Sequence, residues 1–198
     1  MKLQLYNNMV DVVGVPDDGM TDDAFFDFCQ QNRELRMERD HNKQLFIMAP
    51  TGFYTGSFNS TIITEIHLWN RKFKPGKVVD SSTGFILPDG SVLSPDAAWI
   101  SNGKINLLTE AEKQKSPPLC PEFIVALKGN SDALPALKNK LLKWIENGAL
   151  LTWLIIPETQ LVFIYRADNS ISIVQGFTNK LSGENVLPGF ELDLGLLV

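Results

Sequence analysis

The sequence predicts an α/β fold in which helices flank a mixed β-sheet, with additional antiparallel hairpins. Residues 150–156 are apolar at every position except Thr152, which is typical of a strand covered on both faces. A strand over 123–127 and a helical pattern from residue 134 precede it. A strand–helix–strand unit of this kind implies a parallel pair inside the sheet. Turn signals at residues 88–90 (Pro-Asp-Gly) and 168–169 (Asp-Asn) predict the antiparallel hairpins.

The first half of the chain predicts an irregular arm, a short helix, a strand pair and a long helix. Residues 1–20 form the expected N-terminal arm, and Thr21 is a good N-cap for the short helix. Residues 35–49 alternate between apolar and charged residues around a turn at 40–43, which predicts two strands. The long helix is predicted over 57–73, because its apolar residues recur at steps of four, four, three and four. They are Phe58, Ile62, Ile66, Trp69 and Phe73.

The second half is richer in strands. Residues 78–100 predict several strands, with a hairpin that joins 85–87 to 92–93. Asp132 is expected to cap the helix whose apolar stripe begins at Leu134 and which ends at Gly148. A hairpin over 161–174 and two turns, at 183–185 and 188–189, complete the chain. We expect residues 1–198 to form a single domain.

Composition narrows the classes of function. The chain has 198 residues, of which 44% are hydrophobic and 21% charged, and this excludes a disordered protein. A net charge of −5 argues against a protein that coats polyanions, although it leaves room for a local basic patch. Two cysteines and two histidines without metal-ligand spacing argue against zinc sites and histidine-based triads. No apolar run approaches the ~20 residues of a membrane span, and the N-terminus lacks the pattern of a secretory signal. We therefore expect a cytoplasmic protein without a membrane partner.

A pattern for metal-dependent phosphodiester chemistry is present but incomplete. Asp96 follows a Pro at a strand start, and Lys128 ends the next apolar strand. An acid two residues before such a Lys would point to the same face, and it could share a Mg²⁺ ion with Asp96 while the Lys orients the attacking water. That position is Ala126. Glu122 is an even number of residues before Lys128 and would point to the same face of the strand. It lies four residues before position 126, however, which is about 13 Å along the strand.

The chain resembles a known family from about residue 22 to residue 194. It is similar to the cyanobacteria-rich, Uma-type family of restriction endonucleases in the PD-(D/E)XK nuclease superfamily, which implies a restriction-endonuclease-like core. Each matching segment is weak alone, and their common order and spacing make the resemblance specific. The segments are residues 33–38, 47–52, 69–71, 80–85, 87–90, 94–100, 120–125, 146–149 and 186–190.

The resemblance also implies roles for individual residues. Asp96 matches the metal-binding Asp, Lys128 the basic residue of the active site, and Glu38 an N-terminal Glu that assists the metal. Lys140 takes a position that faces phosphate in related nucleases. Ala126 stands at the degenerate position, where the family has its metal-binding Glu.

Two further departures weaken the implied site. Ile156 replaces a common Asp, and Gly129-Asn130 replaces a usual Ser-Pro. Because Asp96 is then the main acid and Glu38 only a weak second ligand, we expect Mg²⁺, the family's cofactor, to bind weakly or not at all. The resulting expectation is a catalytically impaired restriction-endonuclease-like protein, a pseudoenzyme.

Two alternatives stay open. One is an active Mg²⁺-dependent DNA endonuclease with a migrated carboxylate such as Glu38, and the other is a non-catalytic protein that binds nucleic acid or forms a homodimer. The expected partners are DNA and a second copy of the chain. The candidate nucleic-acid contacts are Lys140, Lys138, Arg71, Lys72 and Lys74. For the last three, a cation-rich helix end that complements the helix dipole is the competing explanation.

Overall fold

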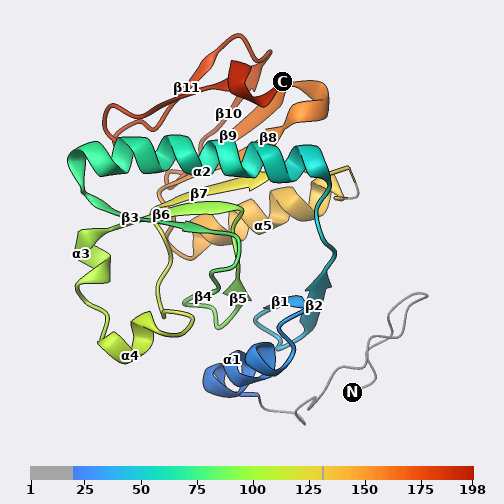
Figure 1. Ribbon diagram of the computed structural model, residues 1–198, viewed down its shortest axis with the longest axis vertical. Helices are drawn as coiled ribbons and strands as arrows, with labels where there is room; N and C mark the ends of the chain where they lie inside the picture. The colour runs from blue at the N-terminus through green and yellow to red at the C-terminus, as the bar shows by residue number, and fades with distance from the viewer. Residues whose placement is uncertain (1–19, 131) are drawn as a thin grey trace.

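The structure is a computed structural model that describes residues 20–130 and 132–198. Nearly all of the expected N-terminal arm, residues 1–19, lies outside the described residues. A six-stranded sheet forms the centre, with the long helix α2 over one face and α5 over the other (Figure 1). This confirms the predicted α/β class.

The central sheet is mixed, as predicted. Its strand order is β10-β9-β8-β7-β6-β3, in which β7 and β8 pair in parallel and every other pair is antiparallel. All six residues of β8 are buried, which fits a sequence that is apolar except at Thr152. The strands are β3 (Gly76–Asp80), β6 (Ala97–Ser101), β7 (Phe123–Leu127), β8 (Leu151–Ile156), β9 (Leu161–Arg166) and β10 (Ile171–Gln175).

Two apolar cores hold the helices to this sheet. The helix α2 (Phe53–Phe73) buries Ile62 and Ile66 in the first core, which also contains Trp153 of the sheet. The helix α5 (Leu134–Glu146) buries Leu141 and Trp144 in the second core. Each fully buried side chain of this size contributes roughly 1.5–3 kcal/mol, so both helices are fixed firmly against the strands.

A second, smaller sheet carries the N-terminal helix. Its order is β2-β1-β5-β4, and α1 (Asp22–Gln31) packs against it with Phe25 and Phe28. Thr21 caps α1 as predicted, since its hydroxyl accepts a hydrogen bond from the backbone N–H of Ala24. The buried Arg39 pairs with Asp22. The strands are β1 (Arg36–Arg39), β2 (Leu45–Met48), β4 (Phe85–Ile86) and β5 (Val92–Leu93).

The remaining elements are short. The helices α3 (Asn102–Ile105) and α4 (Glu110–Lys113) lie between β6 and β7 in the chain, where the sequence predicted no helix. The strands β11 (Lys180–Ser182) and β12 (Glu191–Asp193) form an antiparallel pair. Two 3-10 turns complete the set, η1 (Pro157–Thr159) and η2 (Leu194–Leu197).

Two predictions about helix starts need correction. The helix α2 begins at Phe53 rather than at residue 57. The expected cap of α5 is wrong: Ala133 is its N-cap, without a side-chain hydrogen bond, and the Asp132 carboxylate accepts the backbone N–H of Gly129 instead. Over the described part of the chain, no helix is long and apolar enough to cross a membrane.

Candidate functional site

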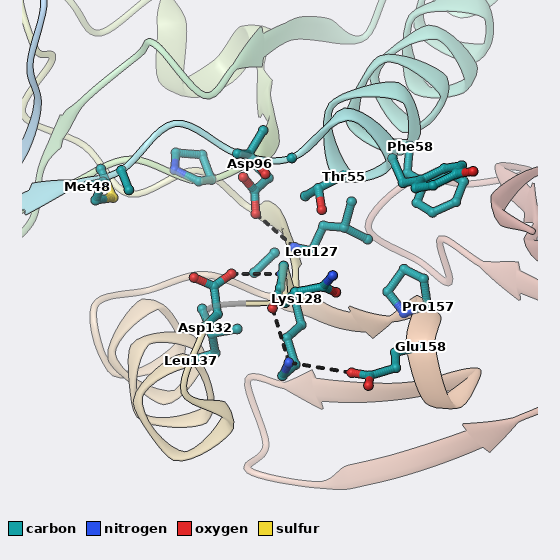
Figure 2. A pocket seen from close by; sticks show the side chains of 18 of the residues that line it. Met48, Thr55, Phe58, Asp96, Leu127, Lys128, Asp132, Leu137, Pro157 and Glu158 are labelled. Carbon is teal, nitrogen blue, oxygen red and sulfur yellow. Dashed lines mark hydrogen bonds and ion pairs between the residues drawn. The ribbon is translucent and has the colours of Figure 1, made fainter.

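A pocket of about 1030 Å³ opens where β6 and β7 meet the first turns of α2 and one side of α5. Its wall includes Asp96, Ala126, Lys128 and Lys140, so the structure brings four of the residues singled out in the sequence to one place. Figure 2 shows Asp96 above and Lys128 below Leu127 at the end of β7, with Thr55 of α2 to the right of Asp96 in this view.

Asp96 and Ala126 lie in the wall of the same pocket, at the end of the β6–β7 pair. The antiparallel pair aligns Ala98 with Ile124 and Ala97 with Val125, and Asp96 directly precedes this paired stretch. The backbone N–H of Asp96 donates to the Val125 carbonyl at 3.0 Å, although Val125 is the partner of Ala97, so the regular register ends at Ala97. Because both residues line one pocket, a carboxylate at position 126 would share that pocket with Asp96.

The neighbouring strand adds no acid to this face. The parallel pair β7–β8 aligns Ala126 with Leu154 and Leu127 with Ile155, so Ile156 follows beside Lys128. Ile156 is buried in the second apolar core. The side of the site that borders β8 is therefore apolar.

The Asp96 carboxylate is held by two donors. Its Oδ2 accepts the backbone N–H of Leu127 at 2.8 Å, and its Oδ1 is 3.4 Å from the side-chain nitrogen of Asn59 on α2. Burial raises the pKa of Asp96, and the Leu127 hydrogen bond together with the charges of Lys140 and Arg36 opposes this rise only in part. Asp96 is therefore easier to protonate than an exposed carboxyl group.

Glu38 and Lys140 form an ion pair at the edge of the pocket. The Lys140 ammonium lies 2.6 Å from Glu38 Oε1 and donates to the Ser94 carbonyl at 2.9 Å. The same Glu38 oxygen accepts the Ser94 backbone N–H at 2.8 Å. This arrangement fixes the loop that leads to Asp96 and occupies one of the two Glu38 carboxylate oxygens.

Lys128 has weaker partners. Its ammonium donates to the Gly129 carbonyl at 3.1 Å and lies 3.9 Å from Glu158, whose side chain is 71% exposed (Figure 2). Arg36 of β1 also lines the pocket, and its guanidinium donates to the Ser81 carbonyl. Sequence reasoning missed Arg36, because its place on a short strand far from residue 96 gives no spacing signal.

The acids of this pocket do not form a cluster. Among residues 20–130 and 132–198, no three His, Cys, Asp or Glu side chains come together to hold a metal. The other acids in the wall, Asp132 and Glu158, lie next to the Gly129 N–H and the Lys128 ammonium. Mg²⁺ is usually held by one or two protein carboxylates and completes its octahedron with waters, so Asp96 alone is the smallest such set.

The other predicted nucleic-acid contacts lie away from the pocket. The Lys138 ammonium sits 3.9 Å from the centre of the Phe163 ring, as a cation–π contact. Arg71 and Lys72 are in the last turn of α2, and Lys74 is its C-cap. Because Arg71 comes 16 residues after Thr55, it lies about 24 Å from the pocket along the helix axis.

An aromatic row borders the mouth of the pocket, and sequence reasoning did not single it out. Phe53, Tyr54 and Phe58 line the pocket from the first six residues of α2. The side chains of Phe53 and Tyr54 are 84% and 73% exposed. The available signal was an aromatic pair directly before the apolar stripe of a helix.

Comparisons with known proteins agree with this fold. A family model described as "Uma2: Putative restriction endonuclease" matches residues 22–195. A solved structure, described as a "putative nuclease belonging to DUF820 from Anabaena variabilis ATCC 29413", is similar with a TM-score of 0.72 and 14% sequence identity. The likeness covers 83% of this chain and 90% of that chain, and at this identity it concerns the fold alone. No curated protein matches the chain.

Proposed function

Because the chain belongs to the Uma2 family, whose model is described as "Putative restriction endonuclease", we propose that it is a restriction-endonuclease-like protein that binds DNA in the pocket around Asp96 but hydrolyses it poorly or not at all. One observation carries the proposal: Asp96 shares this pocket with Ala126, which stands at the position where the family resemblance places a metal-binding Glu. The protein would then use the fold of a nuclease to hold nucleic acid.

Weak catalysis follows from the set of oxygen donors. Asp96 is the main acid that remains, since Glu38 is committed to Lys140 and Ser94. Without a firmly held cation, phosphodiester hydrolysis loses several kcal/mol of charge stabilisation. Each ~1.4 kcal/mol is a factor of ten in rate, so the expected loss is several orders of magnitude.

Retained binding follows from the charges of the same pocket. Arg36, Lys128 and Lys140 are in its wall beside the acids Asp96, Asp132 and Glu158, and positions 126 and 156 add no further carboxylate that would repel a phosphate. Lys128 is held only loosely by an acid, because Glu158 lies 3.9 Å from its ammonium and is exposed. An ammonium with weak partners can exchange them for a charge-assisted hydrogen bond to a phosphate oxygen.

The alternative of an active enzyme with Glu38 as the second metal ligand has less support. Glu38 is not in the wall of the pocket, and its Oε1 already accepts from the Lys140 ammonium and the Ser94 N–H. A movement of Glu38 toward Asp96 that broke the ion pair would leave a half-buried ammonium without its counter-charge.

A homodimeric interaction protein is the second candidate function, because one edge of the central sheet is open. The strand β10 is the last in its sheet, and Ile171 and Ile173 on it are 53% and 60% exposed. Exposed edge strands with apolar side chains pair readily with another strand. Replacing Ile173 with Lys should then shift the sedimentation coefficient from dimer to monomer, and a wild-type monomer at all concentrations would refute this candidate.

The experiment for the main proposal compares binding with cleavage. Fluorescence anisotropy in EDTA should show that the wild type binds a labelled oligonucleotide and that Lys128→Ala weakens binding about tenfold, while Lys180→Ala on β11 does not. Incubation of plasmid with Mg²⁺ or Mn²⁺ should leave it intact. Wild-type cleavage that Asp96→Ala abolishes would contradict the proposed impairment, and a wild type that binds no DNA would contradict the proposed binding.

A further inference from the structure

The aromatic row at the pocket mouth, Phe53, Tyr54 and Phe58, exposes two large rings to solvent. The Phe53 and Tyr54 rings meet edge to face with centroids 5.6 Å apart, and Tyr54 stacks on Phe58 at 6.3 Å. Phe58 packs against the first apolar core and anchors the row, whereas the other two rings are largely in solvent. Folding alone gives no reason to expose two aromatic side chains side by side, since each would gain from burial.

The position of the row points to its use. Phe53, Tyr54 and Lys128 belong to the wall of one pocket, so a ligand whose phosphate meets Lys128 comes next to the rings. Proteins that bind single strands combine cations along the backbone with aromatic rings on which bases stack. A base inside a duplex has both faces covered by its neighbours and offers no face to such a ring.

We propose that Phe53 and Tyr54 form a stacking platform for an unpaired base, so that the ligand of this pocket is single-stranded DNA rather than duplex. The inference rests on the proposed function, because the phosphate of the stacked nucleotide occupies the pocket beside Lys128. Stacking is independent of base identity, since every base has a π-face. The platform therefore gives a preference for strand state and none for sequence.

The test separates stacking from phosphate binding. Three labelled ligands of about 12 nucleotides are compared by anisotropy in EDTA: a single strand of mixed sequence, its duplex, and an abasic strand with the same number of phosphates. The wild type should bind the single strand about 5- to 100-fold more tightly than the abasic strand, the range expected for removal of base–aromatic stacking.

Variants of the aromatic residues and of Lys128 test the two contributions separately. Phe53→Ala and Tyr54→Ala should lose this preference for bases, Tyr54→Trp should keep it, and Leu107→Ala, at another exposed apolar residue, should leave it unchanged. Lys128→Ala should weaken the single strand and the abasic strand by the same factor. Because Phe53 and Tyr54 are exposed, their truncation should not disturb folding, which the thermal melting curve checks.

The outcomes distinguish the platform from the pocket. If Lys128→Ala weakens binding while both aromatic variants behave as wild type, the platform is refuted and the proposed function stands. If Phe53→Ala dissociates a wild-type dimer and leaves the preference for bases intact, the row is a contact between copies and the inference is wrong. If the wild type binds none of the three ligands, the proposed function fails and the inference fails with it.

Discussion

Asp96 and Ala126 line one pocket just beyond the last paired position of β6 and β7, Ala97 with Val125. A second acid at position 126 would therefore share this pocket with Asp96. Ala126 is only 6% exposed, so the methyl group lies against the pocket wall. This relationship makes restoration of the acid a direct experiment.

Ala126→Glu should create a metal site. A second carboxylate in the pocket of Asp96 brings two like charges together in a half-buried place, so the variant without metal should be less stable than wild type by about 1–3 kcal/mol. Mg²⁺ or Mn²⁺ should recover this loss, because a ligand that binds only the folded state stabilises it. Calorimetric titration should show heat of binding that wild type lacks, and plasmid cleavage should appear.

Ala126→Gln is the matched control, since it adds the same volume without the charge. It should show neither metal-dependent stabilisation nor cleavage. A folded Ala126→Glu variant that binds no metal would mean that positions 96 and 126 do not share an ion.

Asp96→Asn should stabilise the protein at neutral pH while weakening any reaction at the site. The raised pKa of Asp96 means that the folded state binds this proton more tightly than the unfolded state does. The free energy of unfolding contributed by this group therefore falls as pH rises through the two pKa values. Asn removes the buried charge, and the Asn59 side-chain oxygen, which is buried without a partner, can accept its new amide donor.

The gain should be about 0.5–2 kcal/mol at pH ~7, the range of stabilising substitutions, and should vanish at pH ~3, where wild-type Asp96 is itself protonated. Urea denaturation at the two pH values measures it. Equal stability of variant and wild type at both values would show that the burial of Asp96 carries no energetic cost.

Lys140→Ala should destabilise the protein more than Lys138→Ala on the same helix. Removing Lys140 leaves the Glu38 carboxylate, whose side chain is 8% exposed, without its counter-charge, at an expected cost of about 2–4 kcal/mol. Lys138 only covers the Phe163 ring, a contact worth roughly 0.5–1 kcal/mol when exposed. Chemical denaturation of the two variants compares them.

The double variant Glu38→Gln/Lys140→Met checks the mechanism, because it removes both charges together. It should recover much of the stability that Lys140→Ala loses. If Lys140→Ala costs no more than Lys138→Ala, the ion pair is not what holds the loop before Asp96.

The sequence predicted the elements whose signal is local. The apolar period of the long helix, the largely apolar strand β8 and the Thr21 cap each depend on a few neighbouring residues, and all three are confirmed. The first turn of α2 was missed because its aromatic residues are exposed and add nothing to the apolar stripe. Asp132 was misassigned because a short acid near a helix start can also accept a loop N–H.

The residues of the candidate site were likewise predictable only where the signal is local. Strand parity puts positions 126 and 128 on one face, so the gap at Ala126 was visible in the sequence. The pairing of Glu38 with Lys140 joins residues 102 positions apart, and no local pattern gives it. Arg36 reaches the pocket through the second sheet, whose place relative to the first is set by tertiary packing.

The basic end of α2 should contribute only to the binding of long ligands. Arg71 lies about 24 Å along the helix from Thr55 at the pocket, which is beyond the reach of a very short single strand even when it is extended. The combined change Arg71→Gln, Lys72→Gln and Lys74→Gln should therefore leave the affinity for a strand of about 3 nucleotides unchanged. For a strand of about 20 nucleotides it should weaken binding and lower the slope of log affinity against log salt by about 0.7 for each phosphate that these cations neutralise in the wild type. Anisotropy at several salt concentrations measures both quantities.

Two outcomes would contradict this prediction. If neither strand responds, these three cations serve only to complement the C-terminal end of the helix dipole. If both respond equally, DNA meets this end of α2 first and the pocket is not the primary binding site.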